Sequence, residues 1–240
     1  MNQAVLRFLL SFLVFLSFYP SCALSDLSVD QHINGLVDLA IDGNDENFID
    51  YVKKNQLINQ SDKDGHTPVY AAMFGSPGLI NDTIALGESL EYRDNLGYTP
   101  LISAALLGYP QAVETLLQKG ADINARNDDG QTAMMVSVLG MSANQVDINA
   151  TADNQWHNRW DKVIEVLLKH GAGVNDVDKR GVSPLFMAIF SQDYKLCRQL
   201  IKAGADVNHK LPSGVTMLQF ARVSSSQAVV DLLIASGAKN

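Results

Sequence analysis

A period of 33 residues constrains this chain more than any other feature of its sequence. A glycine followed two positions later by Ser or Thr recurs at residues 65–68 (GHTP), 97–100 (GYTP), 130–133 (GQTA), 181–184 (GVSP) and 214–217 (GVTM), with spacings of 32, 33, 51 and 33. Gly-Ala pairs keep the same register, and so does an Asn or Glu six residues before each turn glycine (Asn59, Glu91, Asn124, Asn175 and Asn208). This period predicts a row of stacked supersecondary units, each of which buries its apolar face against the next.

Each unit reads as two short helices followed by a projecting loop. A hydroxyl residue is placed to cap the first helix, and proline follows it in three units (Thr67, Thr99, Thr132, Ser183 and Thr216; Pro68, Pro100 and Pro184). Residues 101–108 and 111–120 illustrate the two helices, and the second ends at a glycine that accepts a left-handed cap. Asn55 and Gly87 hold that cap position in the first two units. The polar segment 121–130 predicts a hairpin-like loop, and we call this loop of each unit a finger.

The pattern D-x-x-G-x-T-P-L, followed by A-A, G, V, L-L and G-A-D-x-N, resembles the ankyrin repeat. The match is nearly complete over residues 97–129 and good over 181–213, and it is partial over 65–96, 130–180, 214–240 and a degenerate unit at about 30–64. The resemblance implies an all-α ankyrin-repeat domain over residues 26–240, in which stacked helix-turn-helix units form a curved solenoid. It also implies that the fingers and the first helices line a concave face.

The chain departs from the family pattern in the residue that follows Thr-Pro-Leu. The family usually has His there, where it links neighbouring loops by hydrogen bonds, whereas this chain has Tyr70, Ile102, Met135, Phe186 and Gln219. Without this histidine, we expect cohesion between units to rest more on apolar burial, at about 25 cal/mol per Å².

A second departure is the spacing of 51, which places an insertion at residues 141–160 between the two helices of one unit. Residues 141–153 predict a loop, and Asp153 or Asn154 is placed to cap the helix that follows. Trp156, Trp160, Val163 and Leu167 fall on one helical face, so we expect this second helix to begin one to two turns early. Two alternatives remain for Trp156 and Trp160: they cover the side of the core, or they form a second partner-binding surface.

The first 25 residues differ from the rest of the chain. They contain one charge, Arg7, and residues 8–19 (FLLSFLVFLSFY) carry none. This run is too short to span a membrane as a helix, which takes about twenty residues, and it predicts a secretory signal peptide over residues 1–25, cleaved after Ala23 or Ser25. Export to a bacterial periplasm is our expectation, with secretion or a lipid anchor at Cys22 as alternatives. A buried N-terminal helix is the structural alternative to a signal peptide.

Composition excludes several classes of protein. The chain has 240 residues, 26 acidic side chains against 18 Lys and Arg, and a formal net charge of −8. An acidic chain is a poor binder of nucleic-acid phosphates, and it favours a protein partner with a basic patch. With two cysteines, Cys22 and Cys197, a disulfide framework is excluded, and Cys197 in an apolar helix is typical of a small buried side chain.

No catalytic or metal-binding motif is present, so we expect neither an enzyme nor a cofactor. The five histidines are scattered, and no H-E-x-x-H, C-x-x-C, G-x-S-x-G or P-loop pattern occurs. The finger carboxylates are spread over successive fingers, whereas calcium needs several oxygens converging on one cation, so a solvated face is the better interpretation. An enzyme using the insertion would have only Asp147, Asp153 and His157 available.

The sequence therefore predicts a non-enzymatic protein-protein interaction module, a monomer when free, that binds a partner through its fingers and concave face. The predicted contact residues are Tyr92, Arg93, Leu96, Arg126, Asn127, Asp129, Val136, Lys179, Arg180, Met187, Phe190, His209, Lys210 and Leu211. Two more specific hypotheses follow from the resemblance to exported bacterial members of the family. One is an immunity protein that neutralises a secreted toxin, and the other is an accessory protein of a periplasmic enzyme such as catalase.

Overall fold

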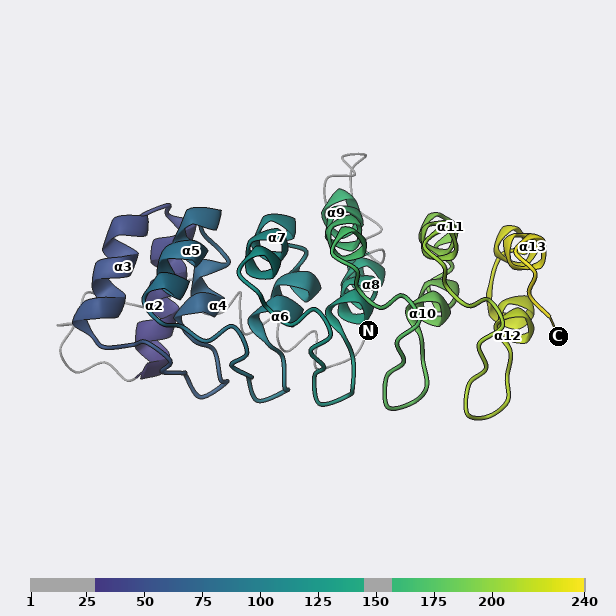
Figure 1. The fold of residues 1–240 in the computed structure, drawn as a ribbon, viewed down its shortest axis with the longest axis horizontal. Coiled ribbons are helices and arrows are strands. Elements are labelled where there is room, and N and C mark those ends of the chain that lie inside the picture. The colour runs from purple at the N-terminus through teal and green to yellow at the C-terminus, as the bar shows by residue number, and fades with distance from the viewer. Residues whose placement is uncertain (1–28, 145–156, 240) are drawn as a thin grey trace.

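The computed structural model describes residues 29–144 and 157–239, and these form two layers of antiparallel helices with loops projecting from one side (Figure 1). The inner layer contains α2 (Val29–Ile41), α4 (Pro68–Ala72), α6 (Pro100–Leu107), α8 (Ala133–Asn144), α10 (Pro184–Phe190) and α12 (Met217–Ser224). The outer layer contains α3 (Asp45–Lys54), α5 (Pro77–Ala85), α7 (Pro110–Gln118), α9 (His157–Lys169), α11 (Tyr194–Lys202) and α13 (Gln227–Ala235). The predicted all-α solenoid is confirmed, and in the described residues the only β-pairing is an isolated bridge between Lys210 and Thr216.

The predicted helix caps are present in three of the five units. The hydroxyl oxygens of Thr99, Ser183 and Thr216 accept hydrogen bonds from the backbone N–H three residues later, at 3.4, 3.3 and 3.1 Å. The prediction is wrong for Thr67, which forms no side-chain cap, and for Thr132, whose buried hydroxyl has no hydrogen-bond partner in the described residues. Because proline already fixes the first residue of α4, that helix starts without the hydroxyl.

The cap predicted at Asn55 also needs correction. Asn55 has φ −96°, and the residue in the left-handed region is Gln56, at φ 53°. The equivalent residue after α7 is Gly120, at φ 94°. Asn55 instead donates its side-chain amide to the Tyr51 carbonyl at 2.9 Å, which prolongs the helical turn by one residue. The finger that follows is one residue shorter than the others as a result.

The core lies between the two layers and continues from unit to unit. Its largest fully buried side chains include Phe48, Leu79, Ile102, Met135 and Leu167, which come from four consecutive units. Cys197 is fully buried in α11, and burial raises the pKa of its thiol to about 12, so it packs as a small apolar group. Among the described helices, none has both the length and the apolarity that a membrane span requires.

The insertion begins later than the sequence indicates, because α8 continues to Asn144. The loop expected from residue 141 is therefore wrong for residues 141–144. The early start of the second helix is confirmed, since α9 has 13 residues and α7 has 9. The predicted cap at Asp153 or Asn154 and the side chain of Trp156 lie outside the described residues.

Trp160 belongs to the core. It is 5% exposed, and its indole N–H donates to the Leu106 carbonyl at 3.1 Å. A Cβ added at Gly140 would lie 2.4 Å from the indole nitrogen, so the ring fits only because residue 140 is glycine. The alternative in which Trp160 helps to form a second partner-binding surface is wrong for this reason, and the ring instead covers the side of the core.

Candidate partner-binding surface

The finger tips are built by one repeated hydrogen-bond pattern. The side-chain Oδ1 of Asp94 accepts from the N–H groups of Leu96 and Tyr98, both at 2.8 Å. The same pattern of acceptance from residues two and four positions later occurs at Asp62, Asn127 and Asp178. An Asx side chain that satisfies two backbone donors fixes a tight turn, and the glycine three positions later completes it. Two residues at the tip of each finger are thereby presented outward.

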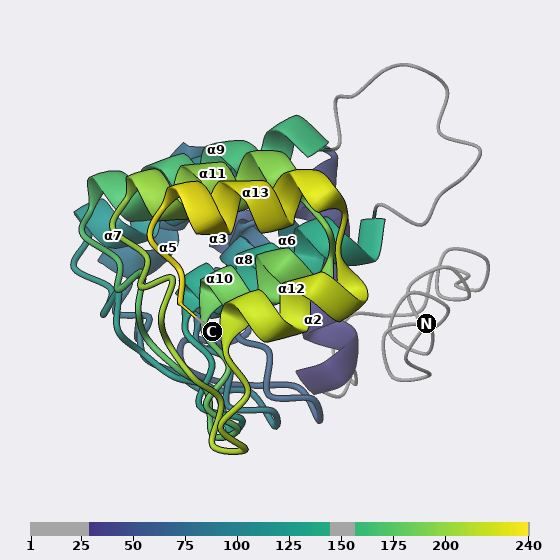
Figure 2. The ribbon, with the colours of Figure 1, turned by 90° about the vertical axis from the view of Figure 1, so that its right-hand side faces the viewer.

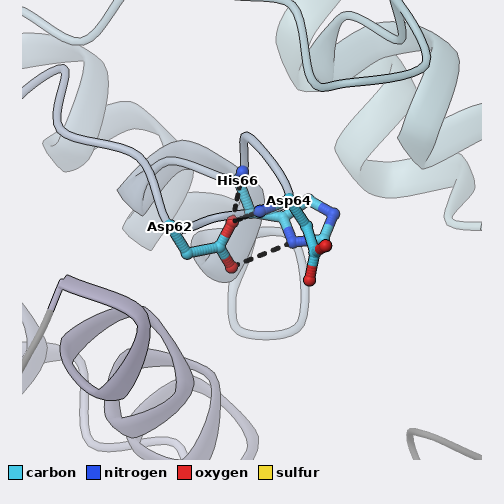
Figure 3. A group of neighbouring side chains, drawn as sticks. All are labelled: Asp62, Asp64 and His66. Carbon is cyan, nitrogen blue, oxygen red and sulfur yellow. Dashed lines mark hydrogen bonds and ion pairs between the residues drawn. The ribbon is translucent and has the colours of Figure 1, made fainter.

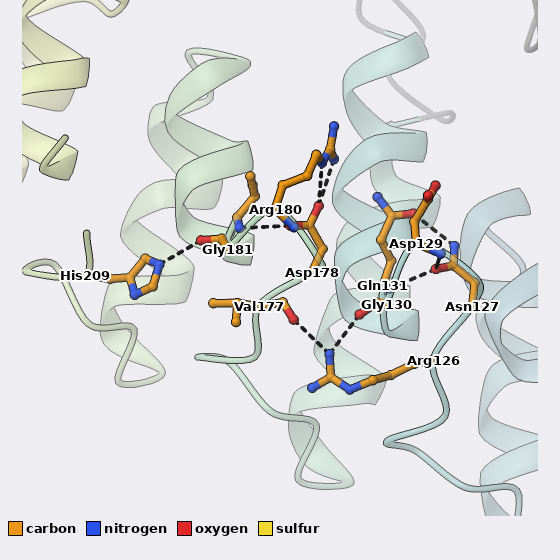
Figure 4. Close-up of polar contacts among 11 residues, drawn as sticks. Arg126, Asn127, Asp129, Gly130, Gln131, Val177, Asp178, Arg180, Gly181 and His209 are labelled. Atoms are coloured by element: carbon orange, nitrogen blue, oxygen red, sulfur yellow. Dashed lines mark hydrogen bonds and ion pairs between the residues drawn. The ribbon is translucent and has the colours of Figure 1, made fainter. Parts of the chain in front are cut away.

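Neighbouring fingers are joined by arginine side chains. Arg93 donates to the Arg126 carbonyl at 2.8 Å and pairs with Asp128. Arg126 in turn donates to the Val177 carbonyl at 2.8 Å (Figure 4). It also pairs with Asp176 at 2.6 Å. Backbone bonds between fingers add to these, such as Lys179 N–H to the Asp129 carbonyl. The expectation that cohesion without the family histidine rests more on apolar burial is therefore incomplete, because polar contacts between fingers contribute as well.

His209 links the last two fingers in a similar way. Its Nε2 donates to the Gly181 carbonyl at 2.8 Å (Figure 4). A histidine from another position of the repeat thus performs a loop-to-loop connection here.

The residue six positions before each turn glycine forms a second connection between units. The side-chain amides of Asn59, Asn175 and Asn208 donate to the carbonyls of Gly87, Gly204 and Gly237, and their Oδ1 atoms accept a backbone N–H two residues after each glycine. Glu91 accepts from Asp122 N–H in the same manner. The third sequence marker therefore has a structural role, because at four of its five positions (Asn59, Glu91, Asn175 and Asn208) it links one unit to the next.

The predicted contact residues differ widely in exposure. Arg93, Leu96, Asp129, Lys179, Arg180, Phe190 and Lys210 are exposed, and Tyr92, Arg126, His209 and Leu211 are half-buried. Three predictions are wrong. Asn127 is buried because it holds its own finger turn, and Val136 and Met187 are buried as members of the continuous apolar core. These three residues offer no surface to a partner.

An apolar row crosses the inner helices at one repeat position, seven residues after the cap residue. We call Phe74, Leu106, Leu139, Phe190 and Val223 the inner-helix row. Phe74 and Leu106 are partly buried, whereas Leu139, Phe190 and Val223 are 38, 70 and 90% exposed. The sequence analysis included Phe190 but missed Leu139 and Val223. The repeat register would have found them, since it places all five in equivalent positions.

In the C-terminal half, further aromatic side chains pack beside this row. The ring of Phe220 in α12 lies 4.4 Å from that of Phe186 and 6.3 Å from that of Phe190, both in α10. Figure 2 shows α10 and α12 side by side in the inner layer, with the fingers projecting past them. The exposed part of the row therefore lies on adjacent inner helices, on the layer from which the fingers project.

The charge of the finger tips changes along the solenoid. The third finger presents Asp128 and Asp129, and the fourth presents Lys179 and Arg180. Acidic residues outnumber basic ones in the first three fingers, whereas the last two carry them in equal number (Asp176, Asp178 and Asp206 against Lys179, Arg180 and Lys210). Arg180 is held by the buried Asp178 at 2.8 Å, so its guanidinium has a fixed position (Figure 4).

Asp62, Asp64 and His66 in the first finger have ligand atoms within 4.8 Å of one another, a spacing that would admit a metal ion (Figure 3). Asp62 already has the turn-forming role of Asp94 and Asp178, and its second oxygen lies 3.1 Å from His66 Nδ1. The histidine lowers the pKa of the Asp62 carboxyl. A finger turn accounts for this arrangement as well as a metal site would.

Glu88 is an unusual residue at the base of the second unit, because the other full units have Ala at this position. It is 5% exposed, and its Oε1 accepts from Asn59 N–H at 2.7 Å, while Oε2 has no partner in the described residues. Burial raises the pKa of its carboxyl to about 7. This buried acid links the first finger to the second unit, far from the exposed apolar row.

Comparison with known families gives a direct match. A family model that describes three copies of the ankyrin repeat matches residues 36–127, 69–148 and 155–240. The human B-cell lymphoma 3 protein is 27% identical over 207 residues, which cover 76% of this chain and 46% of that protein. The chain spans less than half the length of the curated relatives it matches.

Solved structures share the fold over most of this chain. The crystal structure of the ankyrin repeat domain of Bcl-3, described as a unique member of the IkappaB protein family, has a TM-score of 0.69 and 25% identity, covering 85% of this chain and 86% of that one. An ankyrin repeat domain from Acinetobacter baumannii AYE has a TM-score of 0.66 and 25% identity, covering 85% of this chain and 98% of that one.

Proposed function

Because this chain belongs to the ankyrin-repeat family, whose members serve as protein-protein interaction modules, we propose that it is a non-enzymatic protein that binds a partner protein through its fingers and inner helices. The observation that carries this proposal is the exposure of Phe190 and Val223, at 70 and 90%, on adjacent inner helices. Large apolar side chains grouped on a surface mark interaction sites more often than isolated ones do. Both residues lie on the inner layer of helices, so a partner could contact them together with the fingers.

The first three fingers support a partner with a basic patch on one side. Asp64, Asp128 and Asp129 are exposed at their tips, and exposed carboxylates steer a basic surface toward the protein. The structure narrows the set of arginines available for contact, because Arg93 and Arg126 already join fingers. Substitutions of these two arginines would therefore disturb the fold as well as any binding.

Export to a bacterial periplasm is part of the proposal, and it rests on the uncharged apolar run at residues 8–19. N-terminal sequencing of the protein from periplasmic and whole-cell fractions tests it. A mature chain beginning near residue 24 or 26 in the periplasm supports a signal peptide, whereas one beginning at a lipid-modified Cys22 supports the anchored alternative. A full-length chain in the cytoplasm would contradict export altogether.

Capture of the partner tests the binding function itself. The mature protein, immobilised through its C-terminus, is exposed to periplasmic extract of its source cell, and bound proteins are quantified by mass spectrometry. We expect one protein in stoichiometric amount, lost when Phe190→Ser and Val223→Ser are combined and retained with the matched surface variant Ile234→Ser. Recovery of no stoichiometric protein from wild type would count against a binding function.

The immunity and enzyme-accessory hypotheses differ in what deletion of the gene does. An immunity protein forms a one-to-one complex that inhibits a toxin, so deletion poisons the cell unless the toxin gene is also removed. An accessory protein of an enzyme such as catalase leaves viability intact, and deletion lowers that enzyme's activity. The identity of the captured protein separates the two before any deletion is made.

A further inference from the structure

A small pocket lies where the first and second fingers meet the inner helices α4 and α6. Its lining includes His66 of the first finger, Tyr70 of α4, and Tyr92, Asp94 and Tyr98 of the second finger, and we call these five residues the tyrosine pocket. All five are half-buried, so the pocket is reachable from solvent. Its volume of about 10 Å³ is the room that the centre of one water molecule needs, so it can admit one small polar or charged group.

Two of the three tyrosines are held in place by neighbours in the first finger. The hydroxyl of Tyr92 lies 2.8 Å from Ser61 Oγ. The ring of Tyr70 stacks on the ring of His66, with centroids 4.0 Å apart. Side chains whose positions are set before binding lose little conformational entropy when a ligand arrives.

The charge around the tyrosine pocket is negative. Asp94 forms no ion pair in the described part of the chain, and none of the described residues that line the pocket is Lys or Arg. Burial raises the pKa of Tyr70, and the nearby carboxylates of Asp62 and Asp94 raise it further. Burial also raises the pKa of the Asp94 carboxyl, an effect that a cation bound beside it would oppose.

The repeat itself does not require these residues, because the later junctions between fingers lack them. Between the second and third fingers, the equivalent positions hold neutral and mostly non-aromatic residues (Ile102 for Tyr70, Ala125 for Tyr92, Asn127 for Asp94 and Gln131 for Tyr98). The two junctions after that carry no tyrosine at these positions either. The finger turn is nevertheless the same, since Asn127 accepts the N–H four residues later as Asp94 does. The fold therefore leaves the three tyrosines and the charge unexplained.

From these observations we propose that the tyrosine pocket binds the ammonium group of one lysine side chain of the partner protein. Aromatic faces and a carboxylate attract a cation together, the rings through their quadrupole and the carboxylate through its charge. An ammonium group is compact, whereas the planar guanidinium of arginine needs more room than the pocket offers. This inference rests on the proposed binding function and adds one anchoring contact, and its sign agrees with a basic partner surface.

A short peptide tests the pocket without the partner. A blocked pentapeptide with one lysine between glycines is titrated into the protein, whose tyrosines carry an isotope label for NMR. We expect saturable shifts of the ring signals of Tyr70, Tyr92 and Tyr98, and none for Tyr51 and Tyr194, which lie on α3 and α11. The peptide with norleucine in place of lysine should cause no shift, and the peptide with arginine should bind at least about threefold more weakly.

Two variants copy the next junction, so both should fold. Asp94→Asn keeps the turn-forming oxygen, as Asn127 does in the third finger, and removes the charge. Tyr92→Ala introduces the residue found at the equivalent position, Ala125. We expect each variant to bind the lysine peptide at least about fivefold more weakly than wild type. Asp178→Asn makes the same change two fingers later, as a matched control, and should bind within about twofold.

In the complex with the captured partner, the same contact should protect one lysine from acetylation. The partner is treated with acetic anhydride alone, with wild type and with the Asp94→Asn variant, and each lysine is quantified by mass spectrometry. We expect one lysine to react at least about fivefold more slowly with wild type present, and this protection to be lost with the variant.

No shift of the three pocket tyrosines with the lysine peptide, or equal shifts with the norleucine peptide, would overturn the inference and leave the binding function intact. Shifts caused by zinc chloride and not by the lysine peptide would replace it with a metal site at Asp62, Asp64 and His66. A captured partner with no protected lysine would also overturn it. If no protein is captured, the binding function fails whatever the peptide does, and the inference falls with it, a result distinct from the other three.

Discussion

The same repeat position is partly buried in the N-terminal half of the solenoid and exposed in the C-terminal half. In the N-terminal half, Phe74 and Leu106 of the inner-helix row are partly buried against the core. In the C-terminal half, the exposed fraction rises from 38% at Leu139 to 70% at Phe190 and 90% at Val223. The repeat pattern is the same in both halves, so the difference arises from what the neighbouring units place over the row.

Aromatic side chains cover the row in the N-terminal half. The ring of Tyr109 packs edge-on against Phe74, with centroids 5.6 Å apart, and the Arg159 guanidinium lies over the Tyr109 ring at 5.1 Å. Trp160 covers the end of α6, where its indole bonds the Leu106 carbonyl. Both Arg159 and Trp160 come from the lengthened start of α9. The extra turn of this helix therefore packs against the N-terminal part of the row, whereas Phe190 and Val223 stay exposed.

The largest effect should come from removing the Trp160 cover. Trp160→Ala should lower the free energy of unfolding by about 3–5 kcal/mol, because it leaves a large cavity and an unpaired Leu106 carbonyl. Urea denaturation measures this loss. Trp160→Phe is the matched control, since it keeps one aromatic ring in the core but removes the indole N–H and part of the ring volume, and it should cost about 1–2 kcal/mol. A cost below 1 kcal/mol for the alanine variant would show that the ring is not part of the core.

Glu88 should give the N-terminal half a dependence on pH that the C-terminal half lacks. Its pKa of about 7 lies above that of an unfolded glutamate, so the folded state holds the proton more tightly. Stability is then highest below the unfolded pKa and falls as pH rises to 7, by on the order of 2 kcal/mol. Glu88→Gln cannot ionise and should flatten this slope, as measured by urea denaturation at pH 5 and pH 8. The C-terminal control Asp206→Asn, at an exposed finger residue, should leave the slope unchanged.

The helix pairs, finger loops and unit boundaries could be predicted from sequence because each has a local cause, such as proline at a first helical turn. The exposed face of each inner helix could not. Val136 and Phe190 are both apolar residues on first helices, yet one is buried and the other is 70% exposed. An inner helix such as PLISAALL is apolar all round, so it has no amphipathic stripe to distinguish its faces.

The polar contacts between fingers also could not be predicted from the sequence. Arg93 and Arg126 look like free binding residues in the sequence, but their acceptors are backbone carbonyls of the following unit. For Arg126 the acceptor is Val177, 51 residues later and beyond the insertion. Only the packing of consecutive units brings such a pair together, and no local pattern records it.

Loss of an arginine that connects two fingers should lower the free energy of unfolding by a smaller amount. Arg126 bonds across the junction between the third and fourth fingers, where the halves meet, through the Val177 carbonyl and Asp176. It also bonds the Gly130 carbonyl of its own finger. Arg126→Ala should cost about 1–2 kcal/mol. Arg93→Ala, whose ion-pair partner Asp128 is 68% exposed, should cost about 0.5 kcal/mol. Hydrogen exchange of the fourth finger should accelerate in the first variant only, and equal costs for both would remove the special role of the junction.

The smallest effect on stability is expected where the side chains of the inner-helix row are exposed. Phe190→Ser removes a side chain that is 70% exposed, so the free energy of unfolding should change by no more than about 0.5 kcal/mol. The equivalent change at the partly covered position, Leu106→Ser, should cost several times more because it removes packed apolar area. Thermal denaturation of the two variants compares the halves at a single repeat position. Equal losses would show that Phe190 is held by the core, and the C-terminal part of the row would then offer no free apolar side chain at this position to a partner.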